Sequence, residues 1–257
     1  MIPIQESLFD HPAIPGIVTP SDMTQYDHII LSVSGGKDSQ AMAITVQQEA
    51  VKQAVADRLV MVWADTGAEW IETDAHCRYI SRELGIPLVV AKPNQSLPDM
   101  IERRTLWPSS ACRYCTSRAK LDTVIGFVRG YCGKEMQTVL HITGERKGES
   151  AHRALLPEFE LDKLYSSQKR TVIRWRPMLR YEETDIWAVI NGAGMNRHIA
   201  YDAGNDRLSC AICILANKED IRNGAEYHPE LAERYLKFER DSGHQFKHGT
   251  PLKEILK

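Results

Sequence analysis

A short glycine-containing segment near residue 35 has the residue types needed to bind a phosphate group. Its sequence, Ser34-Gly35-Gly36-Lys37-Asp38-Ser39, follows an apolar stretch and precedes a helical pattern. The glycines let backbone amides approach an anion closely, and the start of a helix offers unpaired N–H groups and a positive dipole end. Lys37 adds a charge, and Ser39 can cap the helix or donate its hydroxyl to phosphate. The segment therefore predicts a phosphate site, although it lacks the Walker A spacing; a serine-capped glycine turn is the alternative.

Four of the six cysteines form two Cys-x-x-Cys pairs, about 95 residues apart in the chain. They are Cys112 with Cys115 and Cys210 with Cys213. Four thiolates can hold Zn²⁺ or a 4Fe–4S cluster. Zinc ribbons keep their pairs within roughly 15–20 residues, so this separation is long for zinc. A redox-active pair and buried structural thiols are the alternatives, and Cys77 and Cys132, in helical stretches, are expected to be structural.

The elements that must position these residues follow from the hydrophobic pattern. Buried strands are expected at 28–33, 58–64, 86–91 and 136–143, with helices at 39–54 and 70–84. Strands that alternate with helices predict an α/β fold with a doubly wound, mostly parallel sheet. Such sheets bind ligands at the carboxyl ends of their strands, which is where the phosphate segment falls.

Three parts are expected along the 257 residues. Residues 1–25 form an irregular N-terminal arm, and residues 26–155 form the nucleotide-binding core. Residues 156–257 form a mixed C-terminal extension that carries the second cysteine pair. Within the extension we expect a strand pair at 159–165 and 171–175, and helices at 182–191 and 229–242.

Composition narrows the class of protein. No apolar run approaches the roughly 20 residues needed to cross a bilayer, and the first residues do not resemble a secretory signal, so we expect a cytoplasmic protein without a membrane partner.

A formal net charge of -2 excludes a general polycation, so binding of nucleic acid would need local basic patches. Two candidate patches are Arg103, Arg104, Arg113, Arg118 and Lys120, and Lys169, Arg170, Arg174, Arg176 and Arg180. Trp107, Tyr114 and Trp175 nearby could stack on bases, although solvated charges and core aromatics are the more common explanation.

The segment SGGKDS resembles the PP-loop of N-type ATP pyrophosphatases and of PAPS and APS reductases. Four further elements are similar to that family in the same order along the chain. They are Asp65-Thr66-Gly67 with Glu69, Glu72 and Thr73; Gly144-Glu145-Arg146 with Glu149, Ser150 and Arg153; Pro177 with Asp185 and Trp187; and Tyr201, Asp202, Gly204 and Arg207 before Cys210. The five matches together are far more specific than any one of them.

The resemblance implies a Rossmann-like sheet of the adenine nucleotide alpha hydrolase type that binds ATP with Mg²⁺. It implies catalytic roles for Lys37, Asp38, Asp65 and Arg146. It implies nucleotide contacts from Ser34, Gly35, Gly36, Lys37, Asp38, Ser39, Asp65, Thr66, Gly67, Gly144, Arg146 and Arg153. It also implies that Cys112, Cys115, Cys210 and Cys213 hold a 4Fe–4S cluster, although the family's first pair is usually two adjacent cysteines.

The activity expected from the resemblance is adenylation of an acceptor followed by sulfur incorporation. Reductases of the family carry a nucleophilic cysteine in a C-terminal tail, and this sequence has no cysteine after Cys213. An ATP pyrophosphatase is therefore favoured, with a cysteine desulfurase or another sulfur donor as partner and tRNA or DNA as acceptor, as in tRNA thiolation or the DNA phosphorothioation branch. A sulfonucleotide reductase and a non-catalytic nucleotide- or redox-sensing subunit are the alternatives, and the chain could form an oligomer.

Overall fold

The computed structural model describes residues 22–133 and 136–257. Its centre is a six-stranded sheet with the spatial order β3-β2-β1-β4-β6-β5. The strands are β1 (His28–Val33), β2 (Leu59–Ala64), β3 (Leu88–Ala91), β4 (Gln137–Thr143), β5 (Phe159–Leu161) and β6 (Arg170–Trp175). The β1–β4 and β4–β6 pairs are parallel, and β5 runs antiparallel to β6. The α/β fold with a mostly parallel sheet is therefore confirmed.

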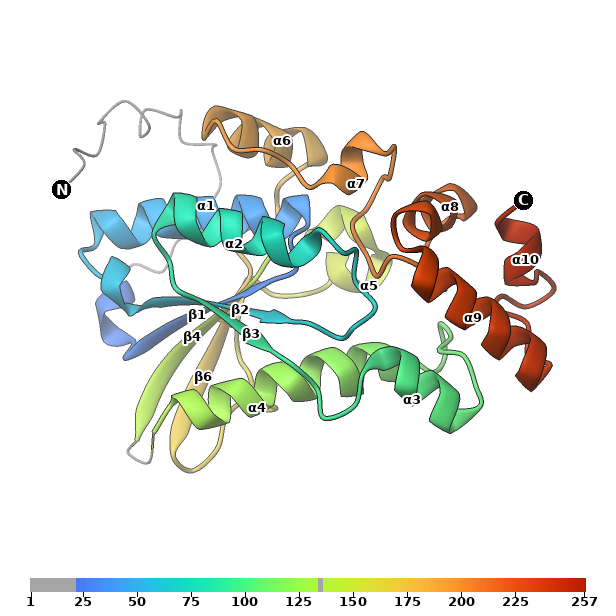
Figure 1. Ribbon diagram of the computed structural model, residues 1–257. Coiled ribbons are helices and arrows are strands. Elements are labelled where there is room, and N and C mark those ends of the chain that lie inside the picture. The colour runs from blue at the N-terminus through green and yellow to red at the C-terminus, as the bar shows by residue number, and fades with distance from the viewer. Residues whose placement is uncertain (1–21, 134–135) are drawn as a thin grey trace. The chain divides into compact units, whose positions relative to one another are not determined.

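Helices of very different lengths connect and follow these strands. They are α1 (Lys37–Lys52), α2 (Thr73–Leu84), α3 (Leu97–Arg104), α4 (Asp122–Tyr131), α5 (Ala151–Ala154), α6 (Glu183–Gly192), α7 (Ile199–Asp202), α8 (Lys218–Tyr227), α9 (Pro229–Ser242) and α10 (Leu252–Ile255). A π-helical turn, η4 (Cys115–Leu121), leads into α4. Figure 1 shows α1 and α6 together over one face of the sheet. None of the helices in the described ranges is long and apolar enough to span a bilayer.

The chain folds into two compact units, each built from separate stretches. Among the described residues, the first contains 22–62, 77–89, 128–133 and 136–197 and holds most of the sheet. The second contains residues 63–76, 90–127 and 198–257. In the second unit, α8, α9 and α10 share an apolar core that includes Trp107, Phe238 and Phe246. The segment boundaries expected at residues 25 and 155 stay a prediction, and residues 1–21 of the expected arm lie outside the described residues.

Local sequence predicted the elements of the sheet well. The strand at 28–33 has the predicted bounds, and the ends of the next three strands differ by at most two residues. The pair expected at 159–165 and 171–175 forms, but its first strand stops at Leu161 because Asp162 turns the chain and accepts hydrogen bonds from two backbone amides. Six helices were not anticipated. The short helices α5, α7 and α10 have only four residues each, too few for a recognisable periodicity, and α3, α4 and α8 were missed although they have eight to ten residues.

Candidate functional site

The phosphate segment lies where the strand order of the sheet reverses. β1 has β2 on one side and β4 on the other, and Ser32 near the end of β1 pairs in register with Thr143 at the end of β4. Open α/β sheets bind ligands at this position, outside the carboxyl ends of the two diverging strands. The segments that follow β1 and β4 therefore face the same crevice, and both carry residues that the sequence singled out.

Residues 34–36 form a tight turn that leaves the start of α1 open to an anion. Gly35 has φ = 77°, a conformation that favours glycine. Gly36 is the N-cap of α1 and supplies no side chain to cover the first amides of the helix. The hydroxyl of Ser39 donates to the Gly36 carbonyl at 2.9 Å and accepts from the Ser34 amide at 3.1 Å. These two hydrogen bonds stabilise the turn.

Lys37 is the first residue of α1 and its side chain is almost completely buried. Only 2% of it is exposed, and its ammonium group lies 3.3 Å from a carboxylate oxygen of Glu183. The same ammonium group lies 5.9 Å from the ring centre of Trp187. Both partners belong to α6, so the helix that follows the sheet holds the lysine in place. The sequence had singled out Trp187 through the resemblance but had missed Glu183.

Arg146 is brought to the phosphate segment by the loop after β4. Its Nε donates to the Asp38 carboxylate, and a terminal nitrogen lies 3.7 Å from Glu183. Burial by itself would lower the pKa of Arg146, but the hydrogen bond to Asp38 and the nearby Glu149 and Glu183 charges outweigh it and raise that pKa. Arg146 therefore stays charged, and with Lys37 it provides two cations beside the amides of α1.

Gly144 lets the loop after β4 touch the phosphate segment. A Cβ built on Gly144 would lie 2.8 Å from the backbone oxygen of Asp38 and 2.9 Å from the Cα of Ser39. Real Cβ atoms essentially never come so close to backbone, so only glycine fits here without a shift. This contact explains in physical terms why the segment after β4 begins with glycine.

A buried arginine supports the loop from behind. The Arg176 side chain is 2% exposed, and it donates to Glu145 at 2.7 Å and to Glu160 at 2.5 Å. Burial would raise the pKa of Glu145, but the hydrogen bond and charge of Arg176, the charge of Arg153 and the hydrogen bond from Thr143 together lower it. Arg153, predicted to clamp an anion, lies 3.6 Å from Glu145 and also pairs with Glu149. Its guanidinium is thus held by two carboxylates, and in this arrangement it supports the loop.

The arrangement can bind a pyrophosphate and stabilise charge that develops on it. Two cations share the Glu183 carboxylate beside the uncapped first turn of α1, and this concentration of positive charge suits a polyphosphate better than a neutral ligand. The residues also fit Mg²⁺ in the way typical of nucleotide sites, where one or two carboxylates and the phosphates themselves hold the ion. Asp38 and Glu183 are the carboxylates available for that role, and Mg²⁺ would neutralise charge on the phosphate oxygens.

The Asp65-Thr66-Gly67 segment belongs to the second unit and is shaped by Glu69. The Glu69 carboxylate accepts from the Thr66 amide at 2.9 Å and from its hydroxyl at 2.8 Å. Asp65 accepts from the Gly67 amide at 3.0 Å and lies 3.0 Å from the Lys92 ammonium. Gly67 has φ = 77°, so glycine is favoured at that turn. One Asp65 oxygen faces an exposed lysine, which a ligand can displace.

All four cysteines of the two pairs lie in the second unit, and three of them are near Lys120. The nearby Cys210, followed by Glu69, Cys213 and Cys115, raises the pKa of Lys120, because these groups when ionised favour the charged ammonium. Burial raises the pKa of Cys210 itself. Cys112 is exposed. The two cysteines expected to be structural, Cys77 and Cys132, are buried.

The fit of these thiols to a metal cluster is incomplete. Their chemistry is suitable, because four thiols belong to one unit and three of them lie near enough to Lys120 to affect its pKa. Across residues 22–133 and 136–257, however, no three His, Cys, Asp or Glu side chains come close enough together to hold a metal ion. A cluster would require the two cysteine segments to draw together.

The candidate basic cluster at residues 169–180 is mostly buried or paired, which favours packing over phosphate binding for these arginines. Arg170 and Arg176 are buried, while Arg174 and Arg180 pair with Asp162 and Glu158. The three aromatic residues considered for base stacking, Trp107, Tyr114 and Trp175, are buried as well. These side chains serve packing, and the sequence could not distinguish a buried, paired arginine from an exposed one.

The mostly parallel sheet, with a glycine turn at the reversal of its strand order, is typical of α/β proteins that bind nucleotides, and comparison with known proteins gives the family. The phosphoadenosine phosphosulfate reductase domain matches residues 28–216, well over half of the chain. The chain belongs to that family.

Among curated proteins, the chain is 26% identical to the uncharacterized protein MJ0973 of Methanocaldococcus jannaschii, over 80% of this chain and 46% of the relative. It is 25% identical to an uncharacterized 37.8 kDa protein of Escherichia phage 186, over 82% of this chain and 74% of the relative. The chain thus spans less than half the length of the first of these relatives.

Solved structures share the fold at low sequence identity. The PAPS reductase of Candida auris, in a phosphate complex, has a TM-score of 0.51 and 16% identity over 71% of this chain and 81% of that one. The FMN adenylyltransferase of Candida glabrata has a TM-score of 0.53 and 13% identity, over 75% of this chain and 55% of that one. The U34-tRNA thiolase NcsA of Methanococcus maripaludis, with its [4Fe-4S] cluster, is 14% identical over 86% of this chain and 74% of that one, but its TM-score of 0.47 is too low to support an argument. The first two likenesses show the fold alone.

Proposed function

We propose that this chain is a PP-loop ATP pyrophosphatase that adenylates an acceptor and so prepares it for sulfur incorporation. The observation that carries the proposal is the site around Lys37. The Lys37 ammonium and the Arg146 guanidinium both approach the Glu183 carboxylate, and α1 begins beside them without a side-chain cap, at the reversal of the strand order. Such a set binds the β and γ phosphates and stabilises the negative charge that develops when they leave.

In the proposed reaction an oxygen of the acceptor attacks the α-phosphorus of ATP. The acceptor–phosphorus bond forms, the bond from the α-phosphorus to the bridging oxygen breaks, and pyrophosphate leaves with that electron pair. Lys37 and the start of α1 hold the pyrophosphate, and Arg146 lies beside it on the same crevice. A sulfur nucleophile from a donor protein, of the cysteine desulfurase type, would then displace AMP from the acceptor.

Nucleic acid is the acceptor class that we propose, with tRNA thiolation and DNA phosphorothioation as the corresponding reactions. We further propose that the four cysteines Cys112, Cys115, Cys210 and Cys213 hold a 4Fe–4S cluster once their segments close. In this proposal, Asp65 and Thr66 contact the ribose of the bound nucleotide or a metal-bound water.

The test is product analysis with ATP labelled at the α-phosphate, in the presence of Mg²⁺, on anaerobically purified protein. Labelled AMP or an adenylated acceptor, with a matching amount of pyrophosphate, is expected in the presence of DNA or tRNA and is expected to be lost in Lys37→Ala. If no labelled product forms with either nucleic acid while PAPS is consumed, the chain is a sulfonucleotide reductase and the proposal fails. If nucleotides bind without any turnover, it is a sensing subunit.

A further inference from the structure

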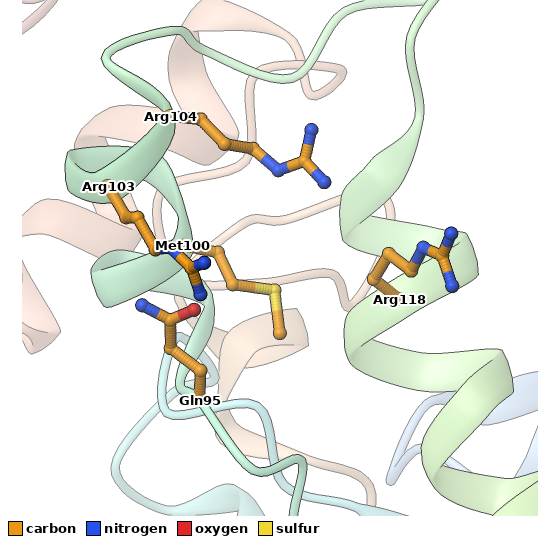
Figure 2. Close-up of a pocket in the computed structure, with 5 residues that line it drawn as sticks. All are labelled: Gln95, Met100, Arg103, Arg104 and Arg118. Atoms are coloured by element: carbon orange, nitrogen blue, oxygen red, sulfur yellow. The ribbon is translucent and has the colours of Figure 1, made fainter.

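A pocket lined by three arginines lies in the second unit and takes no part in the site described above. Its volume is about 370 Å³, and Arg103, Arg104, Arg118, Gln95 and Met100 line it (Figure 2). Pockets that hold small ligands span roughly 300–1,000 Å³, so this one has room for about one nucleotide unit. Two different segments form it, because α3 carries Arg103 and Arg104 whereas Arg118 belongs to η4.

The positive charge of this pocket is not cancelled by the acidic residues of the same helix. The carboxylates of α3, Asp99 and Glu102, both accept hydrogen bonds from Arg234, at 2.5 Å and 2.7 Å. Those bonds lower the pKa of both carboxyl groups, so both stay ionised and bound to Arg234. The two arginines of α3 are thereby left without a carboxylate partner in the part of the chain that the structure describes.

The side chains of the three arginines are positioned and accessible for binding a ligand. Arg104 is kept in place by the ring of Tyr114, whose centre lies 4.6 Å from its guanidinium carbon. Arg118 is paired at 3.0 Å with Asp122, but both side chains are largely exposed, so the pair is weak and easily exchanged for a phosphate. Arg103 is exposed and makes no ion pair within the described ranges.

The spread of the guanidinium groups indicates what kind of anion fits. Figure 2 shows the three groups at well-separated positions on two walls of the pocket instead of converging on one point. A single small phosphate would engage one guanidinium fork at a time, whereas successive phosphates of a strand can engage several. Met100 and Gln95 add an apolar surface and an amide between the arginines, which suit a sugar or base edge.

We propose that Arg103, Arg104 and Arg118 bind the sugar–phosphate backbone of a single-stranded nucleic-acid segment. The pocket is too small for a duplex, and an unpaired strand can place one nucleotide in it while its flanking phosphates reach the outer arginines. This inference deepens the proposed function, since it names the part of the chain that holds the acceptor.

The test is fluorescence anisotropy of labelled single-stranded DNA and RNA oligonucleotides with the full chain, over a range of salt concentrations. Arg103→Gln with Arg104→Gln should weaken binding by roughly tenfold and reduce the salt slope by about 0.7 for each phosphate that the variant no longer binds. Arg103→Gln alone should produce part of that effect without touching the stacked Arg104. Arg129→Gln removes an exposed arginine of α4 and should leave the affinity and the slope unchanged.

Unchanged affinity and slope in the double variant would overturn the inference. So would arginine-dependent binding of inorganic phosphate or adenosine 3′,5′-bisphosphate without arginine-dependent binding of the oligonucleotides, which would make this a small-ligand site. Failure of the proposed function has a different signature. Arginine-dependent oligonucleotide binding without AMP or pyrophosphate formation would support the nucleic-acid site and refute the pyrophosphatase activity. AMP and pyrophosphate formation without arginine-dependent oligonucleotide binding would support the activity and refute the nucleic-acid site.

Discussion

The Lys37 ammonium lies 3.3 Å from the Glu183 carboxylate, and it joins the first turn of α1 to the first turn of α6. The two side chains differ sharply in exposure: 2% of the Lys37 side chain is accessible to solvent, compared with 55% of the Glu183 side chain. Arg146 also approaches Glu183, at 3.7 Å. Glu183 therefore pairs with Lys37 and Arg146, the two cations that we assign to pyrophosphate binding. A bound phosphate would compete with Glu183 for both cations.

Lys37→Ala should abolish turnover while the fold is kept. Removing one preorganised group that stabilises developing charge lowers rates by roughly 100- to 1,000-fold, and we expect a loss of that size in AMP formation. Asp65→Ala should lose activity in the same assay. Lys52→Ala, at the exposed end of the same helix, is the matched control and should retain activity. Full activity in both Lys37→Ala and Asp65→Ala would refute the site assignment.

Glu183→Gln should strengthen ATP binding when Mg²⁺ is absent. Because the Glu183 carboxylate is more than half exposed, its competition with phosphate should be worth about as much as a solvent-screened ion pair, roughly 0.2–1 kcal/mol, so Glu183→Gln should lower the Kd for ATP by up to about fivefold. Equilibrium dialysis in the presence of a chelator measures the change without a metal contribution. Glu233→Gln, which alters an exposed carboxylate of α9, should leave the Kd unchanged. Weaker ATP binding by Glu183→Gln would show that the carboxylate supports the site instead of competing for it.

Gly144→Ala should reduce both stability and nucleotide affinity. The added Cβ would lie 2.8 Å from the Asp38 carbonyl oxygen, and overpacking of this kind costs about 1–3 kcal/mol. The displaced loop should also move Arg146, so the Kd for ATP should rise. Gly126→Ala in α4 is the control, because its Cβ meets open space and alanine stabilises a helix interior by about 0.5–1 kcal/mol. Thermal unfolding with and without ATP measures both effects; equal melting temperatures for the two variants would contradict the close approach.

Acid should destabilise the protein between pH 6.5 and pH 4 through His198. Burial, with a smaller contribution from His76, lowers the pKa of His198 from 6.5 to about 4. The unfolded state binds the proton more tightly, so stability is fully present above pH 6.5 and is lost as the pH falls towards 4. A shift of this size corresponds to a loss on the order of 3 kcal/mol.

His198→Asn tests this assignment by denaturant unfolding at several pH values. The Nδ1 of His198 accepts from the Ala200 amide at 3.1 Å, and asparagine can also serve as this N-cap. The variant should therefore show a flatter dependence of stability on pH. Part of the dependence should persist, because burial also lowers the pKa of His76 to about 4. An unchanged slope would mean that His198 does not titrate as proposed.

Cys112→Ser combined with Cys213→Ser should remove iron and brown colour from anaerobically purified protein. The double variant takes one thiolate from each pair, and a 4Fe–4S cluster needs four. Cys132→Ser changes a buried cysteine outside the pairs and should keep the iron. Metal analysis and the visible spectrum provide the measurement. Stoichiometric zinc in the unaltered protein would refute the cluster.

The sequence by itself determined the sheet, the phosphate turn and the family. Strand 28–33, the glycines at 35 and 36 and the start of α1 are local features, because backbone freedom, helix capping and apolar runs act within a few residues. Gly144 and Arg146 were singled out by motif, although the reason for the glycine, contact with Asp38, was not visible.

Only the tertiary structure decided which charges meet. Elements far apart in sequence determine three features of the charged side chains. They are the pairing of Lys37 with Glu183, the burial of Arg176 against Glu145, and the exposure of Arg103. Two basic clusters looked alike as sequence, yet the four arginines of the one at 169–180 are buried or paired, and Arg103, Arg104 and Arg118 of the other line a pocket. Residue type specifies a charge, but its burial and its partner depend on how the strands and helices pack, and those two properties decide whether the charge stabilises the fold or binds a ligand.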